Sequence, residues 1–304
     1  MRRLSTIGLL VIAWRLHGQD STFSADVRVV NLLATVRDRD GRFVKGLTKE
    51  DFVLQEEGRP QPIGYFVQES NLPLAIGLLV DTSCSQIRVL ESERTASYKF
   101  LDQVLRGDDM AFLLHFDYRV SLLQGFTSSR EELATAFSRL SRPKHCNTLL
   151  FDAIHDASEQ LMRKQGGRKA FVVLSDGGDA RSKNSISTAI EFAQRADTII
   201  YSVLFADRQR IGHPAVMAVQ AVYLERGRKT MRQLAQETGG GYFAVSKENS
   251  IEKIYAAIED DLRNQYSMGY TPDRIEGEKT FRKIALATKN KDLMVRTRAG
   301  YYPK

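Results

Sequence analysis

The segment Asp81-Thr82-Ser83-Cys84-Ser85 places one carboxylate and three hydroxyl groups within five residues. Oxygen atoms of this kind are the ligands that Mg²⁺ and Mn²⁺ prefer in proteins. Asp81, Ser83 and Ser85 stand at every second position, so in a turn that follows a strand all three side chains can converge on one ion. The chemistry that this segment predicts is the binding of a divalent cation.

A fully apolar run, residues 74–80, comes directly before Asp81. Such a run predicts a buried strand of a parallel sheet, and open α/β sheets bind ligands beyond the carboxyl ends of their strands. Asp176 follows a second run of this type, and Thr148 lies between the two. The alternative is that Asp81 and Ser83 cap the next helix and that Asp176 sits in a turn before two glycines.

The pattern D-x-S-x-S, followed in order by Thr148 and Asp176, resembles the metal-ion-dependent adhesion site of von Willebrand factor A-type domains. The resemblance implies that Ser83 and Ser85 bind the ion directly, that Thr148 exchanges between direct and water-mediated contact, and that the two aspartates act through water. It also implies Mg²⁺, or Mn²⁺ or Ca²⁺, as the cofactor. The partner would be a protein whose acidic side chain takes the open position on the ion.

The two cysteines, Cys84 and Cys146, lie in the first and second of these segments, where the family usually has glycine. If both loops meet at one ion, the sulfur atoms become neighbours, and an oxidising compartment would permit a disulfide between them. Two free small residues beneath the site are the alternative, and the sequence leaves both open. Neither cysteine has the spacing of a zinc ligand.

Strand and helix patterns alternate over residues 71–262. This alternation predicts an α/β fold with a doubly wound, mostly parallel sheet, and residues 119–126 predict one antiparallel edge strand. The layout matches that of von Willebrand A-type, Rossmann-like domains. Residues 20–70 and 263–304 show strand patterns instead, with one strand expected over residues 295–302, and we expect these segments to pack together as a small β-rich module. These flanking segments also resemble exported von Willebrand A-related proteins described mainly from acidobacteria.

Residues 1–19 resemble a signal peptide, because Arg2-Arg3 precedes a short apolar core and small or polar residues follow it. The core is too short to span a bilayer. We therefore expect export to the periplasm or the extracellular space, with no integral membrane segment after the signal is removed. A disordered start or a misassigned first methionine is the alternative.

The chain of 304 residues has a formal net charge of +7, with 44 Lys and Arg against 37 Asp and Glu. It contains no Lys/Arg run and no basic-aromatic motif of the kind that binds nucleic acid, so no nucleic-acid partner is expected. Residues 207–228 carry four arginines beyond a predicted strand. Arg208 and Arg210 could contact an acidic partner there. The simpler interpretation is a solvated helical insertion that packs its apolar side on the core through Val216, Val219 and Val222. A separate helix is expected after it, over residues 231–237.

These observations predict a non-enzymatic adhesion or assembly module that presents a divalent cation to an acidic group of a partner. The alternative is a metal-dependent hydrolase of phospho- or sulfo-esters, because Asp-Thr-Ser with a divalent ion could serve such chemistry. His145 adjoins Cys146, but adjacent residues rarely face each other, and no third catalytic group is evident. No P-loop, G-x-S-x-G or G-x-G-x-x-G is present. We interpret His115, on a predicted buried strand, as a core residue and expect no catalytic residues.

Overall fold

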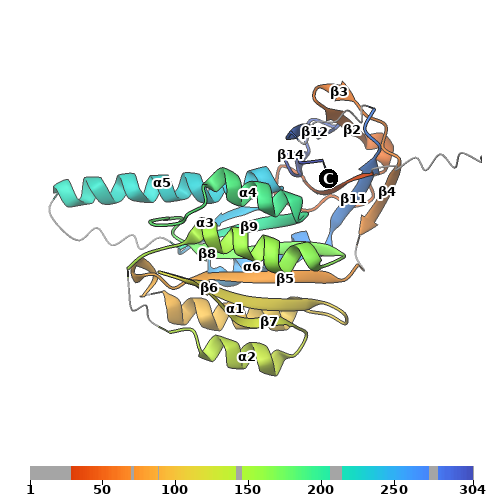
Figure 1. The fold of residues 1–304 in the computed structure, drawn as a ribbon. Helices are drawn as coiled ribbons and strands as arrows, with labels where there is room; N and C mark the ends of the chain where they lie inside the picture. The colour runs from red at the N-terminus through yellow and green to blue at the C-terminus, as the bar shows by residue number, and fades with distance from the viewer. Residues whose placement is uncertain are drawn as a thin grey trace, which may run out of the picture.

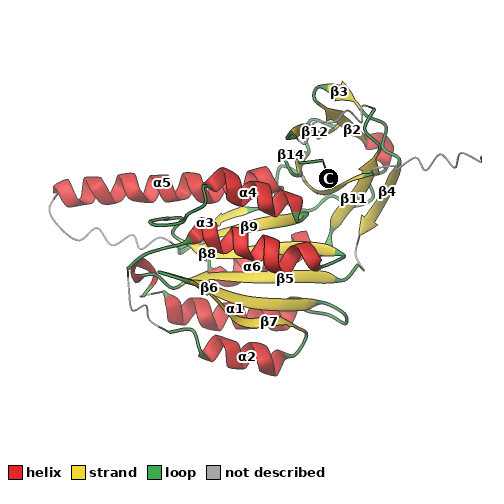
Figure 2. Ribbon diagram, viewed as in Figure 1, coloured by secondary structure: helices red, strands yellow, loops and turns green. Residues whose placement is uncertain are grey.

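The fold is described from a computed structural model that covers residues 29–69, 72–87, 89–141, 146–205, 214–273 and 280–303. These residues form an α/β domain on a six-stranded sheet and a β module of two four-stranded antiparallel sheets (Figures 1 and 2). The expected signal segment, residues 1–19, and the two candidate arginines, Arg208 and Arg210, lie outside the described residues. Within the described residues, no helix is long and apolar enough to cross a membrane.

The central sheet has the strand order β10-β9-β8-β5-β6-β7. All neighbouring strands run parallel except β7, which pairs with β6 in the antiparallel direction at one edge. Both β5 and β8 are buried at every position, which explains their continuous apolar runs. The predicted α/β class and its antiparallel edge strand are confirmed. The strand bounds are β5 (Leu74–Asp81), β6 (Met110–Phe116), β7 (Val120–Thr127), β8 (Arg168–Ser175), β9 (Thr198–Leu204) and β10 (Tyr242–Ala244).

Helices cover both faces of this sheet, and each face has its own apolar core. One face carries α1 (Leu90–Val104), α2 (Arg130–Ser138) and α6 (Ile251–Arg263). The other carries α3 (Leu150–Asp156), α4 (Ile186–Arg195) and α5 (Pro214–Thr238). The turns after β5 and β8 lie at the carboxyl edge of the sheet between these two layers, where the sequence predicted a ligand site.

The β module combines strands from before and after the α/β domain. One sheet has the order β13-β1-β11-β4 and the other β14-β12-β2-β3, and one apolar core lies between them. The single strand expected over residues 295–302 is two short strands, because the backbone passes from one sheet to the other at Thr297. The strand bounds are β1 (Val30–Arg37), β2 (Phe52–Glu56), β3 (Arg59–Pro60), β4 (Tyr65–Glu69), β11 (Gln265–Tyr270), β12 (Arg282–Thr288), β13 (Met294–Arg296) and β14 (Gly300–Tyr301).

A buried aspartate of α6 joins the β module to the α/β domain. Asp261 has no exposed surface and forms ion pairs with Arg37 of β1 and Arg296 of β13. Arg298, which precedes β14, also pairs with Asp197, which precedes β9, at 2.9 Å. The two parts of the molecule are thus connected by charged hydrogen bonds as well as by chain continuity.

Helix α5 differs from the expectation. The sequence predicted a helix over residues 231–237 after a separate insertion, whereas α5 is one continuous helix of 25 residues. Val219 and Val222 were expected to pack on the core, but both are exposed. The reason is that the part of α5 before Gly227 projects beyond the carboxyl edge of the sheet, where no core lies beneath it (Figure 1).

Candidate metal centre

The first loop, residues 81–87, forms a compact turn at the end of β5. Asp81 is fully buried, and its Oδ1 atom accepts a hydrogen bond of 2.9 Å from the backbone N–H of Ser83. A short 3₁₀ turn, Cys84–Gln86, follows and brings the hydroxyl of Ser85 to 3.1 Å from that of Ser83. The two hydroxyl groups predicted to be ligands are therefore neighbours above a buried carboxylate.

The second loop, residues 146–149, is covalently tied to the first. Cys84 and Cys146 form a disulfide whose Cα atoms are 4.9 Å apart. Cys146 is two residues before Thr148, so the crosslink holds the predicted threonine ligand close to the first loop. Thr148 is buried.

The third loop, residues 175–182, contacts both others. The hydroxyl of Ser175 donates to Oδ2 of Asp81 at 2.6 Å, and the backbone N–H of Ala180 donates to the carbonyl oxygen of Thr148 at 3.0 Å. Together with the disulfide, these bonds make a closed ring of contacts among the three loops. Ser175 was not predicted as part of the site, although its place directly before Asp176 could have suggested it.

Asp176 is buried at the start of the third loop, and its Oδ1 atom accepts a 2.9 Å hydrogen bond from the N–H of Gly178. Burial, with a smaller contribution from the charge of Asp176, raises the pKa of Asp81 to about 7. A bound cation would offset this cost, because it stabilises the charged form of a carboxylate. No group of three or more His, Cys, Asp or Glu side chains suited to a metal occurs in the described part of the chain. The candidate donors that the sequence points to on these loops are hydroxyls and carboxylates, which fit a hard divalent ion.

Helix α5 packs against the third loop through glycines. A Cβ atom added to Gly227 would lie 2.1 Å from the carbonyl oxygen of Asp176, and one added to Gly177 would lie 2.3 Å from that of Gly227. Gly177 also has a φ of +78°, which favours glycine. The helix and the loop can approach this closely because neither residue has a side chain.

Tyr223 lies one turn before Gly227 and reaches the site. A Cβ atom on Gly178 would lie 2.0 Å from its hydroxyl oxygen, so the hydroxyl sits directly against the third loop. Burial, followed by the charges of Asp176, Asp81 and Asp179, raises the pKa of Tyr223 to about 12. No sequence signal pointed to this residue, because its position depends on α5 running unbroken through Gly227.

Two further aspartates, Asp152 and Asp179, stabilise the end of the third loop and the residues after it. Oδ2 and Oδ1 of Asp152 accept from the N–H groups of Lys183 and Asn184 at 3.0 and 2.9 Å. Asp179 accepts from the hydroxyl of Ser182 at 2.6 Å. These carboxylates are engaged in shaping the loop after Asp176.

His115 contacts a buried threonine. Its Nδ1 atom is 2.9 Å from the hydroxyl oxygen of Thr82, which is buried, and burial lowers the pKa of His115. A buried hydroxyl is poorly placed to attack a substrate, so this pair has the character of a core hydrogen bond. His145 lies outside the described residues.

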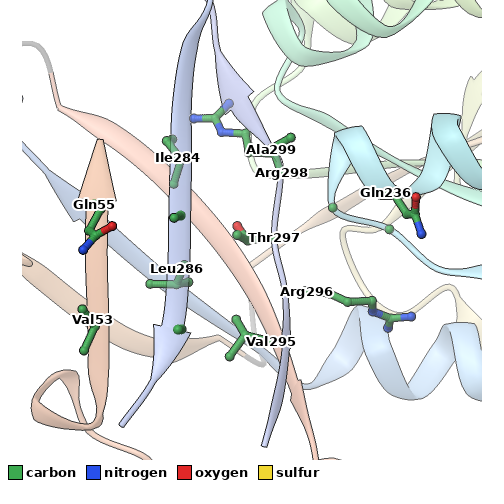
Figure 3. Close-up of a pocket in the computed structure, with 14 residues that line it drawn as sticks. Val53, Gln55, Gln236, Ile284, Leu286, Val295, Arg296, Thr297, Arg298 and Ala299 are labelled. Carbon is green, nitrogen blue, oxygen red and sulfur yellow. The ribbon is translucent and has the colours of Figure 1, made fainter. Parts of the chain in front are cut away.

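A hollow of about 470 Å³ lies at the other end of α5, near Gln236 (Figure 3). It opens between β12 and residues 295–299, and Leu286 and Val295 contribute to its apolar lining. Its arginines are already engaged, Arg296 with Asp261 and Arg298 with Asp197 at 2.9 Å. The hollow belongs to the joint between the two parts of the molecule and is not part of the metal centre.

Comparison of the sequence with models of known protein families gives one match. The sequence profile of the von Willebrand factor type A domain matches residues 76–257. No curated protein matches the chain.

Solved structures share the fold at low sequence identity. Proximal thread matrix protein 1 from the mussel byssus is 12% identical with a TM-score of 0.52, covering 68% of this chain and 51% of that protein. A form of it described as having a zinc-occupied MIDAS motif has a TM-score of 0.50 at 12% identity, covering 68% of this chain and 49% of its own. A von Willebrand factor type A protein from Catenulispora acidiphila is 10% identical with a TM-score of 0.51. The match covers 86% of this chain and 75% of that protein.

Proposed function

This chain belongs to the von Willebrand factor type A domain family, and on that basis we propose that it is a metal-ion-dependent protein-binding module for adhesion or assembly, without enzymatic activity. Domains of this family are in general protein-interaction modules. The finer proposal is that this chain presents a divalent cation, Mg²⁺ in the first place, to an acidic side chain of a protein partner.

Ser83, Ser85 and Thr148 would hold the ion through their hydroxyl groups, and Asp81 and Asp176 would support it through water. When bound, the ion supplies an electrophilic centre with few anionic ligands, which favours a carboxylate from outside. Mg²⁺ retains water in its coordination shell, and one such water can be exchanged for a partner's carboxylate. The mussel byssus protein is described with zinc at its motif, so Zn²⁺ belongs among the ions to be tested here.

The observation that carries the proposal is the closed ring of contacts among the three loops. Ser175 with Asp81, Ala180 with Thr148, and the disulfide each join a different pair of loops. These contacts join the loops that carry Ser83, Ser85 and Thr148 to the loops of two buried carboxylates, which supports the proposal. A helix cap, the alternative for Asp81 and Ser83, requires none of these contacts between loops.

We further propose that the protein is exported, to the periplasm or the extracellular space. The disulfide between Cys84 and Cys146 supports this, because structural disulfides persist in oxidising compartments and are rare in the cytosol.

Calorimetric titration of the full chain with Mg²⁺, Mn²⁺, Ca²⁺ and Zn²⁺ tests the metal site. We expect saturable binding at one site by the wild type and by the control Ser138→Ala, which changes an exposed serine of α2. The double variant Ser83→Ala/Ser85→Ala should lose this binding. Wild-type protein that binds none of these ions would refute the proposal.

The absence of enzymatic activity is tested with p-nitrophenyl phosphate and p-nitrophenyl sulfate. Ion-saturated wild type should hydrolyse neither faster than Ser83→Ala/Ser85→Ala does. Turnover that requires both serines would instead establish the hydrolase alternative.

A further inference from the structure

The projecting half of α5, residues 214–226, carries large apolar side chains that face solvent. Val219 is 71% exposed, Val222 62% and Tyr223 47%. The two valines are the most exposed large apolar side chains in the part of the chain that the structure describes. Solvent-facing apolar groups gathered in one place mark interaction sites more often than single exposed residues do.

These side chains form one stripe along the helix. Val222 and Tyr223 are three and four residues after Val219, and such positions are neighbours on a helical surface. Arg226, also exposed, continues the stripe four residues after Val222. The "α5 stripe" is therefore an apolar strip that ends in a positive charge near the metal centre.

The α5 stripe is continuous with the metal centre through Tyr223. Its hydroxyl lies against Gly178 of the third loop, and the residue as a whole is 47% exposed. From Gly227 back to Pro214 the helix extends for about 20 Å at 1.5 Å per residue. It projects beyond the carboxyl edge of the sheet (Figure 1), so the α5 stripe extends outward from the edge that carries the three loops.

We propose that the α5 stripe is the second half of the partner-docking surface, and that the partner is a protein segment in which an acidic side chain lies next to apolar ones. This inference rests on the function proposed above. The acidic group binds the ion, and the neighbouring apolar side chains pack on Val219, Val222 and the ring of Tyr223.

Charge complementarity supports this choice of partner. Without an ion, the carboxyl groups of Asp81 and Asp176 offer no positive charge that would attract an acidic side chain. With the ion bound, the ion and Arg226 both attract one, and such attraction steers encounter as well as adding affinity. The apolar side chains then give specificity, since an acidic group alone would fit any exposed cation.

The test uses the full chain and a phage-displayed library of random peptides, selected in Mg²⁺ and eluted with EDTA. We expect the eluted peptides to combine Asp or Glu with apolar neighbours. A synthetic copy of a selected peptide should bind about tenfold more weakly to Val219→Ser/Val222→Ser, a loss typical of removing a central apolar contact.

Two controls separate the α5 stripe from the ion. The double variant should keep the wild-type Mg²⁺ affinity by calorimetry, since neither valine is a proposed ligand. The matched control Val67→Ser, a 49% exposed valine of β4 in the β module, should bind the peptide as the wild type does.

Each other outcome overturns a specific part. Selected peptides that are acidic without apolar neighbours, or that bind the double variant as tightly as the wild type, refute the inference and leave the proposed function standing. If the protein binds Mg²⁺ but the selection yields no peptide whose binding depends on Mg²⁺, both the inference and the proposed function are refuted. A dimer in light scattering that the double variant abolishes would show that a second copy of this chain covers the stripe.

Discussion

Ser175 donates a hydrogen bond of 2.6 Å to the buried carboxylate of Asp81, and so joins the end of β8 to the end of β5. The bond favours the charged form of Asp81, but burial and the nearby charge of Asp176 outweigh it and raise the pKa to about 7. The third loop thus contributes opposing effects on one carboxylate, a stabilising hydroxyl and a destabilising charge. Which protonation state Asp81 adopts without metal is therefore set by pH.

The metal-free protein should lose stability as pH rises from the reference pKa of Asp81, 3.8, to about 7. Because the pKa of Asp81 is about 7 when folded and 3.8 in the reference state, its stabilising contribution is complete below the reference value and is lost as pH rises through about 7. The loss approaches about 4 kcal/mol at 1.4 kcal/mol per pKa unit. In denaturant unfolding in EDTA, the free energy of unfolding of Asp81→Asn should rise relative to that of the wild type as pH increases. Saturating Mg²⁺ should reduce the pH dependence of the wild type alone.

Asp152 should change stability with pH in the opposite direction to Asp81. Burial of Asp152 is outweighed by hydrogen bonds from Lys183 and Asn184, so its pKa is lowered. The contribution of Asp152 should therefore be lost as pH falls, and Asp152→Asn should gain on the wild type in acid. Equal pH dependence of the two variants would contradict both assignments.

Reduction of the disulfide should weaken both the fold and the site. Cys84 and Cys146 are 62 residues apart, and a crosslink over that distance stabilises by about 4 kcal/mol through the entropy of the unfolded chain. Unfolding with and without a reductant measures the loss, and Mg²⁺ affinity should fall because the loop of Thr148 is released. Cys84→Ser/Cys146→Ser should already show both effects and should not respond to the reductant. A wild type that keeps its stability when reduced would rule out this role.

Replacement of Gly227 by alanine should destabilise the protein, although Gly→Ala usually stabilises a helix. In an exposed helix interior, Gly→Ala stabilises by about 1 kcal/mol. Here the new Cβ would lie 2.1 Å from the carbonyl oxygen of Asp176, so we expect Gly227→Ala to destabilise by about 2 kcal/mol and to lower Mg²⁺ affinity. Gly166→Ala, with no atom within 4 Å of the added Cβ, is the control. A stabilised Gly227→Ala would show that α5 does not press on the third loop.

Loss of the buried aspartate of α6 should be costly. Asp261→Ala removes the shared partner of Arg37 and Arg296. Arg37 keeps its pair with Asp260 at 3.1 Å, so we expect a loss of about 3 kcal/mol, the lower end of the cost of breaking a buried ion pair. Asp292→Ala removes the exposed pair with Arg39 and should change the free energy of unfolding by less than about 1 kcal/mol. Similar thermal unfolding midpoints for the two variants would count against Asp261 as the joint between domain and module.

The sequence predicted the α/β fold well where local pattern and burial agree. β5 and β8 are buried on both faces, so their apolar runs are continuous, and the polar residues that follow must lie at the sheet edge. The loops that carry Asp81, Thr148 and Asp176 therefore lie at the same edge of the sheet. Their roles as metal ligands stay predictions that the calorimetry tests.

What the sequence did not predict depends on contacts between distant segments. Gly227 argues against a continuous helix by propensity alone, and a single sequence does not show that it lies against Asp176. Tyr223 was missed for the same reason. The state of the two cysteines was left open because it depends on a distance that only the folded loops define. The strand expected over residues 295–302 was divided because its two halves find partners in different sheets.

The pairing of Val30 with Tyr270 in the β module has a consequence for the order in which the molecule is made. The α/β domain is one continuous stretch and can close before the last strands emerge from the ribosome. β1 must wait for β11 and β2 for β12, and such long-range closures form slowly. The α/β domain can therefore fold before the β module, whose two sheets close only when the last strands of the chain are available.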